Sequence, residues 1–375
     1  MKKLEYELRF LAPAFLGNAE QSAQWRTPPI KALLRQWWRV VWAAEHGFST
    51  NVAAMRQEEG ALFGVASDGE GDSRKSRVRL RLDSWAEGKL RSWAGLEQGT
   101  VYHPEVQRTN FKVGPHAYLG YGPLDGRGGT RLGEKINATI QAGESATFAL
   151  AVSDADAPAL EKALALMHRF GTLGGRSRNG WGSFALTPQG DTGPLNVNPP
   201  LRPWRDCLDR DWPHAVGRDE KGALIWQTAP HADWKALMET LAVIKIGLRT
   251  QFEFPKVAPP HPKPLERHWL SYPITRHVTL AFDRNARLPN SLRFKVRALP
   301  DGKLVGMIFH VPCLPPPAFR PARSVIEKVW QQVHCLLDEL TNPKAGRTYS
   351  MIANPQRRAA LKPGLDEITL QRVKE

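Results

Sequence analysis

The chain has 375 residues, with 52 Lys and Arg against 37 Asp and Glu, which gives a formal net charge of +15. This length predicts two domains, and no run approaches the roughly 20 uncharged apolar residues that a membrane span needs. Glu5 and Glu7 precede any apolar run, which argues against a signal peptide. The basic balance favours a polyanionic partner, because cations that neutralise phosphates release condensed counterions.

The three cysteines, Cys207, Cys313 and Cys335, are odd in number, far apart and form no CxxC pair. A disulfide framework or a structural zinc site therefore does not fit. The pattern is typical of buried thiols in a reducing cytoplasm. The sequence predicts no cofactor and no metal ion.

A Pro-rich stretch over residues 187–204 divides the chain into halves of similar size. Because prolines cluster where regular elements stop, we predict an N-terminal domain over 1–190, a linker over 191–204 and a C-terminal domain over 205–375. A second Pro-rich run, 255–264, predicts a long loop inside the C-terminal half.

The N-terminal half alternates as strands at residues 3–10, 77–83, 145–152 and 181–186, and has helical periodicity at 28–46 and 158–170. The order β-α-β-β-α-β is that of a ferredoxin-like, RRM-like domain. It predicts an α+β fold in which two helices cover one face of a four-stranded antiparallel sheet.

A long insertion, about residues 84–143, separates the second and third predicted strands. Insertions of this length in a compact domain are usually functional or disordered. This one is rich in aromatic and basic residues, which favours a functional role: Tyr102, His103, Arg108, Phe111, Lys112, His116, Tyr118, Tyr121, Arg127 and Arg131.

The C-terminal half predicts strands at 222–228, 277–282, 291–296 and 303–311, with helices at 232–246 and 321–340. A Pro-Asp-Gly turn at 300–302 joins the last two strands. This element order, without any repeat of residues, predicts a second ferredoxin-like domain.

The predicted helix over 28–46 has two different sides. At about 100° per residue, one side collects the apolar residues Ile30, Leu33, Leu34, Trp37, Val41 and Ala44. A separate side collects Lys31, Arg35, Trp38, Arg39 and Trp42. Cations can follow phosphates and indoles can stack on bases, so this side predicts an RNA-binding surface. The alternative is that Trp38 and Trp42 are core or subunit-contact residues beside solvated charges.

Residues 171–182 contain five glycines among twelve positions, between a predicted helix and a predicted strand. Glycines allow the backbone to approach a ligand closely, and exposed N–H groups can hold phosphate oxygens. Arg176 and Arg178 add charge-assisted hydrogen bonds. No Gly-Lys-Ser/Thr follows, so the run is not a Walker A loop.

This Gly-rich run resembles the signature loop of the RAMP superfamily, the ferredoxin-like RNA-binding proteins of CRISPR systems. Five further segments are most similar to the first subunit of type III-B Cmr effector complexes: FLGNA at 15–19, RTPPIK at 26–31, LRQWWR at 34–39, EGALFG at 59–64 and YLGYG at 118–122. Asn18 and Ala32 stand where that family usually has glycine.

The resemblance implies two tandem ferredoxin-like domains in a non-catalytic subunit at the end of an RNA-guided complex. Its partners would be the CRISPR guide RNA near its 3′ part, the target RNA and other RAMP subunits, with no membrane. The predicted RNA-binding residues are Arg26, Lys31, Arg35, Arg39 and the loop residues Gly174, Gly175, Arg176 and Arg178, to which the helix pattern adds Trp38.

Two other classes of function stay open. A metal-independent RAMP endoribonuclease that processes repeat RNA would need a general acid or base, for which His46, His103 and His116 are candidates. A Mg²⁺-dependent site could use Asp125, which has no evident acidic partner.

A scaffold that binds only sister proteins is the remaining alternative. In that case Trp38 and Trp42 would be interface anchors, because indoles are enriched at the centres of protein interfaces.

Overall fold

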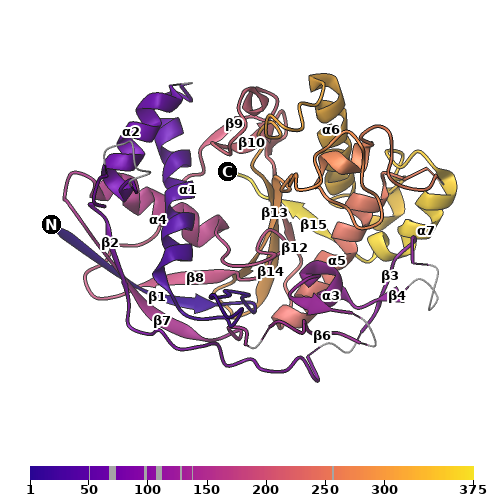
Figure 1. Ribbon diagram of the computed structural model, residues 1–375. Helices are drawn as coiled ribbons and strands as arrows, with labels where there is room; N and C mark the ends of the chain where they lie inside the picture. Colours follow the sequence, from indigo (N-terminus) through magenta and orange to yellow (C-terminus); the bar gives the residue numbers. More distant parts are fainter. Residues whose placement is uncertain are drawn as a thin grey trace. The chain divides into compact units, whose positions relative to one another are not determined.

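The computed structural model is an α+β protein with several small, mostly antiparallel sheets (Figure 1). It describes residues 1–49, 51–66, 73–96, 99–106, 112–126, 129–136, 138–255 and 257–375. Among the aromatic and basic residues named for the predicted insertion, Arg108, Phe111 and Arg127 lie outside this part of the chain.

Contacts divide the chain into two compact units. The first contains Met1–Trp93, Leu132–Pro200 and Lys295–Pro300, and the second contains Ala94–Arg131, Leu201–Phe294 and Asp301–Glu375. By its contacts, most of the predicted insertion belongs to the second unit. The domain boundaries drawn from the sequence stay a prediction.

The first unit contains a four-stranded sheet of β1 (Lys2–Phe10), β2 (Arg79–Leu82), β7 (Ser145–Val152) and β8 (Phe184–Pro188). The strand order is β2-β7-β1-β8, and each neighbouring pair is antiparallel. The four predicted strands are confirmed, although the last begins at Phe184 rather than at residue 181. Alternation was a reliable guide here because one face of each strand is buried.

Two helices, α1 (Thr27–Glu45) and α4 (Ala157–Phe170), confirm the two predicted helices of this unit and pack against each other. Trp37, expected in the core, is 1% exposed and its ring lies 5.5 Å from that of Phe170. The buried side of the sheet presents apolar residues at alternate positions of β1, namely Leu4, Tyr6, Leu8 and Phe10.

A third helix, α2 (Val52–Phe63), is absent from the sequence prediction. The side chain of Asn51 caps it by accepting a hydrogen bond of 3.0 Å from the backbone N–H of Ala54. Its buried residues include Glu59 and Gly60 beside Leu62 and Phe63. A carboxylate and a glycine on the buried side conceal the apolar period from which a helix is normally predicted.

In the described residues between β2 and β7, the helices and strands are short. These are β3 (Val101–Tyr102), β4 (Lys112–Val113), α3 (Pro115–Gly120), β5 (Leu124–Asp125) and β6 (Arg131–Leu132). β3 pairs with β4, and β5 with β6, as two-stranded sheets.

A second four-stranded sheet has the order β13-β14-β12-β15, and a three-stranded sheet has the order β11-β10-β9. Their strands belong to the second unit, except that β13 from Lys295 onward is assigned to the first. The strands are β9 (Leu201–Pro203), β10 (Val216–Asp219), β11 (Gly222–Ala223), β12 (Ile225–Thr228), β13 (Leu292–Ala298), β14 (Leu304–His310) and β15 (Leu370–Arg372). The helices are α5 (Trp234–Thr250), α6 (Arg323–Glu339) and α7 (Pro355–Asp366). Short 3-10 turns occur at Asp206–Asp209, Glu266–Trp269 and Lys344–Gly346.

The predicted helices at 232–246 and 321–340 and the predicted strands at 291–296 and 303–311 are confirmed by α5, α6, β13 and β14. The predicted strand at 222–228 is divided into β11 and β12. The predicted strand at 277–282 is wrong, since only an isolated bridge joins Thr279 to His261. Of the apolar residues on one side of this run, Val278 and Leu280 are 41% and 70% exposed and only Phe282 is buried, so the alternation does not reflect one continuous buried face.

Cys207, Cys313 and Cys335 are free thiols. Burial raises the pKa of the Cys207 thiol to about 12. Among the residues that the structure describes, no helix is both long and apolar enough to cross a bilayer.

We predict that Trp37→Ala lowers the free energy of unfolding by about 3–5 kcal/mol, because it leaves a large cavity between α1 and α4. Trp85 is 57% exposed, so Trp85→Ala is the matched control and should change stability by no more than about 0.5 kcal/mol. Urea unfolding of both variants measures the difference. Equal losses would contradict the assignment of Trp37 to the core.

Candidate nucleic-acid interface

The start of α1 is anchored to the loop that precedes it. Arg26 has an extended backbone (φ −158°) immediately before the helix, and its guanidinium donates a hydrogen bond to the carbonyl of Gly17. Pro28 and Pro29 occupy the first turn, where a missing N–H costs nothing. Arg26 is therefore held at a defined place rather than on a free loop.

The Gly-rich run contacts the same loop. The backbone N–H of Gly175 donates to the carbonyl of Phe15 at 2.8 Å. Gly174 has φ +92°, and a Cβ atom there would lie 2.6 Å from that carbonyl oxygen. Only glycine fits this close approach. Arg26 and the Gly174–Gly175 pair thus contact one short segment, from Phe15 to Gly17.

The Gly-rich run also begins against α1. A Cβ atom on Gly171 would lie 2.4 Å from the carbonyl oxygen of Met167 and 3.0 Å from the side chain of Leu33. The contact therefore involves Leu33 on the apolar side of α1, whereas Lys31, two positions earlier, points to a different side of the helix. Burial, together with the charge of Arg35, lowers the pKa of Lys31.

The middle of the run is a turn that exposes its first arginine. The N–H of Asn179 donates to the carbonyl of Arg176 at 2.9 Å, and the N–H of Gly180 donates to that of Ser177 at 3.1 Å. Arg176 has φ +54° and an exposed side chain, whereas Arg178 is half-buried. The structure thus places two of the predicted cations on this turn.

A buried carboxylate from α2 joins the two remaining arginines of the predicted site. Glu59 is 2% exposed, and Arg39 binds both its oxygens, at 2.6 and 2.9 Å. Arg35 forms a second ion pair with it at 2.8 Å. Burial alone would raise the pKa of Glu59, but hydrogen bonds and charges from the two arginines lower it overall. The sequence places Glu59 in a family motif without revealing this role.

The indoles expected on the outer side of α1 are buried, so that prediction is wrong. Trp38 is 4% exposed and meets the ring of Phe63 edge-on at 5.9 Å. Trp42 is 3% exposed, and its Nε1 donates to Glu58 at 2.9 Å. Helix α2, which the sequence did not predict, supplies both partners and covers this side of α1.

The three candidate catalytic histidines do not come together in one unit. His46 follows α1 in the first unit, where its Nδ1 lies 2.8 Å from the carbonyl of Trp42. His103 and His116 lie in the second unit, and burial lowers the pKa of each to about 4. The ring of His103 meets that of Tyr118 at 5.3 Å.

Asp125 forms an ion pair with Arg131 at 3.1 Å. In the described residues, no three His, Cys, Asp or Glu side chains are grouped as metal ligands would be.

A family model described as the RAMP superfamily matches residues 7–185. This range includes α1, α2 and the whole Gly-rich run. A comparison with curated proteins found no match.

Two solved structures resemble the chain at low sequence identity. Cmr1 from Pyrococcus furiosus, in its apo form, is 15% identical with a TM-score of 0.46, and the match covers 87% of this chain and 93% of that one. A chain of the type III-B Cmr-beta complex bound to cognate target RNA and AMPPnP is 11% identical with a TM-score of 0.45, over 88% of this chain and 99% of that one.

We predict that Gly182→Ala destabilises the protein by about 2 kcal/mol or more, because the new Cβ atom would lie 1.8 Å from the carbonyl oxygen of Leu173. Gly190→Ala is the control. It has a similar positive φ, +55° against +64°, but nothing lies within 4 Å of its Cβ position. It should cost only about 1 kcal/mol of backbone strain. Thermal unfolding compares them, and equal effects would contradict the close packing of the run.

We predict that Arg35→Ala with Arg39→Ala destabilises the protein at neutral pH, because Glu59 would stay buried without a partner. The loss should reach up to about 3 kcal/mol, since water partly screens these half-exposed arginines. Adding Glu59→Gln should restore most of it. The folded-state pKa of Glu59 lies below 4.5, so the pairing stabilises the fold above that pH and is lost as the pH falls through the folded-state value.

Denaturant unfolding at several pH values tests this triad. The difference between the wild type and the double variant should shrink in acid. A double variant that unfolds like the wild type at neutral pH would contradict the pairing.

Proposed function

We propose that this chain, whose residues 7–185 match the family model of the RAMP superfamily, is a non-catalytic RNA-binding subunit of a type III-B-like CRISPR effector complex. It contacts the guide RNA near its 3′ part and the target RNA, and it assembles with other RAMP subunits in the cytoplasm. The sequence segments at 15–19, 26–31, 34–39, 59–64 and 118–122 support this subtype.

We propose that each unit is built on a ferredoxin-like arrangement. Numbered in chain order, the strands of the first sheet lie in the order second, third, first, fourth, as β2-β7-β1-β8. The second four-stranded sheet, β13-β14-β12-β15, has the same order. Helices α1 and α4 connect the strands of the first sheet where a βαββαβ unit requires them, and α5 and α6 do so in the second.

The observation that carries the RNA assignment is the shared segment between α1 and the Gly-rich run. The carbonyl of Phe15 accepts a hydrogen bond from the backbone N–H of Gly175, and the carbonyl of Gly17 accepts one from the guanidinium of Arg26. The loop from Phe15 to Gly17 therefore contacts both the Gly-rich run and the residue that precedes α1. Lys31 on α1 and Arg176 on the Gly-rich run supply further cations for this proposed surface. The glycines hold the run against the loop, and the cations around it suit a phosphate backbone.

Arg35 and Arg39 contribute to this surface in a different way. Because Glu59 neutralises part of their charge, the two arginines and the glutamate carry one net positive charge rather than two. They serve to orient α1 and to present the outer edges of their guanidinium groups. Trp38 helps to hold the same helix in place, because its ring packs against Phe63 of α2.

A metal-independent endoribonuclease is the second candidate, supported by the contact between His103 and Tyr118. His103 is 6% exposed, and its pKa of about 4 leaves it neutral at pH 7. Incubating the purified chain with repeat RNA, with and without EDTA, separates the two functions. A specific cut that survives EDTA and disappears in His103→Ala would establish the nuclease.

We predict that Lys31→Ala with Arg176→Ala weakens binding of single-stranded RNA. It should also reduce the slope of log K against log salt by about 1.4, because two phosphate contacts are lost. Lys3→Ala with Arg9→Ala removes the same charge from the outer face of β1 and should change the slope less. Fluorescence anisotropy over a salt series measures both, and equal slopes for the wild type and the first variant would contradict the assigned surface.

A further inference from the structure

The edge strand β2 carries two arginines on the face of the first sheet opposite its buried side. Arg79 and Arg81 are exposed, and their cross-strand partners on β7 are Ala151 and Ala149. Alanines leave the space above them open. Within the described part of the chain, neither guanidinium has a hydrogen-bond or ion-pair partner, unlike Arg35 and Arg39 on α1.

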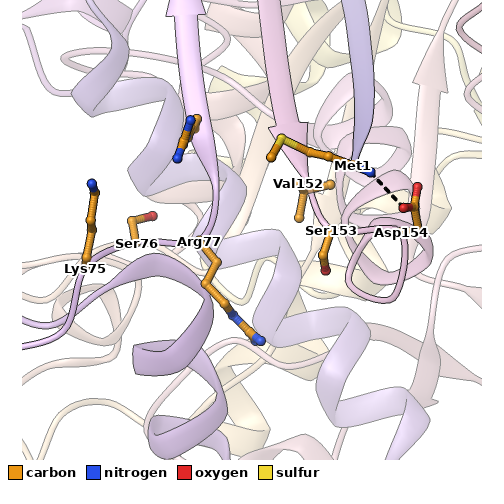
Figure 2. A pocket seen from close by; sticks show the side chains of 8 residues that line it. Met1, Lys75, Ser76, Arg77, Val152, Ser153 and Asp154 are labelled. Atoms are coloured by element: carbon orange, nitrogen blue, oxygen red, sulfur yellow. Dashed lines mark hydrogen bonds and ion pairs between the residues drawn. The ribbon is translucent and has the colours of Figure 1, made fainter.

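A basic pocket lies at the N-terminal end of β2. It has a volume of about 440 Å³, and Lys75, Arg77 and Arg79 contribute cations to its lining. Figure 2 shows Lys75 and Arg77 on one side of it and Asp154 on the other. The carboxylate of Asp154 is occupied by the Met1 amine at 2.8 Å. Arg77 is paired with Asp156 at 3.2 Å, so the positive charge that suits the pocket to an anion comes mainly from Lys75 and Arg79.

An exposed indole follows the other end of the same strand. Trp85 is 57% exposed, yet its backbone is fixed, because its carbonyl accepts from the side chain of Gln24 at 2.9 Å. The next carbonyl, that of Ala86, accepts a hydrogen bond from the backbone N–H of Trp25 at 3.0 Å. Gly88 is packed so closely that a Cβ atom would lie 2.3 Å from the carbonyl oxygen of Thr139. The backbone at Trp85 is therefore fixed, and its indole is presented to solvent.

We propose that a single strand of RNA binds along this edge, from the pocket to Trp85. Its phosphates contact Arg79 and Arg81, and one base stacks on the indole. The proposal rests on the RNA-binding function proposed above and adds a second contact region to it. Arg79 and Arg81 project to the same side about 7 Å apart, the spacing of alternate residues in a strand, and cations that follow phosphates beside an aromatic ring are the usual elements of a single-strand site.

Acidic side chains restrict the path of the RNA to the edge. Glu5 and Glu7 lie on the same outer face, on the central strand β1, and Glu5 is opposite Ala149 of β7. Lys3 pairs with Glu5 at 2.8 Å, so this pair adds no net charge to the face and Glu7 remains as the carboxylate of the central strand. Along the edge, the carboxylate of Asp83 between Arg81 and Trp85 accepts a hydrogen bond of 2.8 Å from the backbone N–H of Thr147.

The test uses the full chain and a fluorescein-labelled oligouridine in anisotropy titrations over a salt series. Arg79→Ala with Arg81→Ala should reduce the slope of log K against log salt by about 1.4. Lys3→Ala with Arg9→Ala is the matched control from the same sheet face, with the same loss of charge. Trp85→Ala should weaken binding roughly fivefold to a hundredfold with an unchanged slope, and Trp85→Phe should retain most of the affinity.

A double variant of β2 that behaves like the control overturns the proposal. If Lys31→Ala with Arg176→Ala still weakens binding in that case, the proposed function stands and only the second region is lost. A wild-type chain that binds no oligouridine at low salt overturns both. Polyglutamate that competes as well as oligouridine at equal charge would overturn the assignment to RNA, because an acidic protein segment would then suffice.

Discussion

The carboxylate of Glu59, buried between Arg35 and Arg39, determines what helix α1 presents to solvent. A charge in a low-dielectric interior needs partners, and both partners come from the outer side of α1. The pairing fixes α2 against that side. As a result Phe63 and Glu58 cover Trp38 and Trp42. Arg26 and Lys31 remain as cations at the start of α1, where Arg26 contacts the same loop as the Gly-rich run.

The sequence predicted the elements of the first sheet because each strand has one buried face, so alternation along β1 and β7 directly reflects the packing. It could not predict α2, since Glu59 and Gly60 interrupt its apolar period. The burial of Trp38 and Trp42 was missed for the same reason. A helical wheel separates the sides of one helix but does not show that a second helix covers the polar side.

The composition of the Gly-rich run predicted a close approach of its backbone to a ligand. In the structure the backbone approaches the chain itself, since Gly174 lies against Phe15 and Gly182 against Leu173. These contacts hold the turn that carries Arg176.

In the second unit, the prediction of a strand at 277–282 was wrong because Val278 and Leu280 face solvent. Alternation alone does not reveal whether a core is present.

We propose that RNA contacts the first unit at the start of α1, at the Gly-rich run and along β2. Photo-crosslinking of 4-thiouridine-containing RNA to the full chain, followed by identification of the linked peptides, tests this placement most directly. The account predicts linked peptides that contain Arg26 or Lys31, Arg176 and Trp85. Crosslinks confined to the second unit, or none at all to these three peptides, would contradict it.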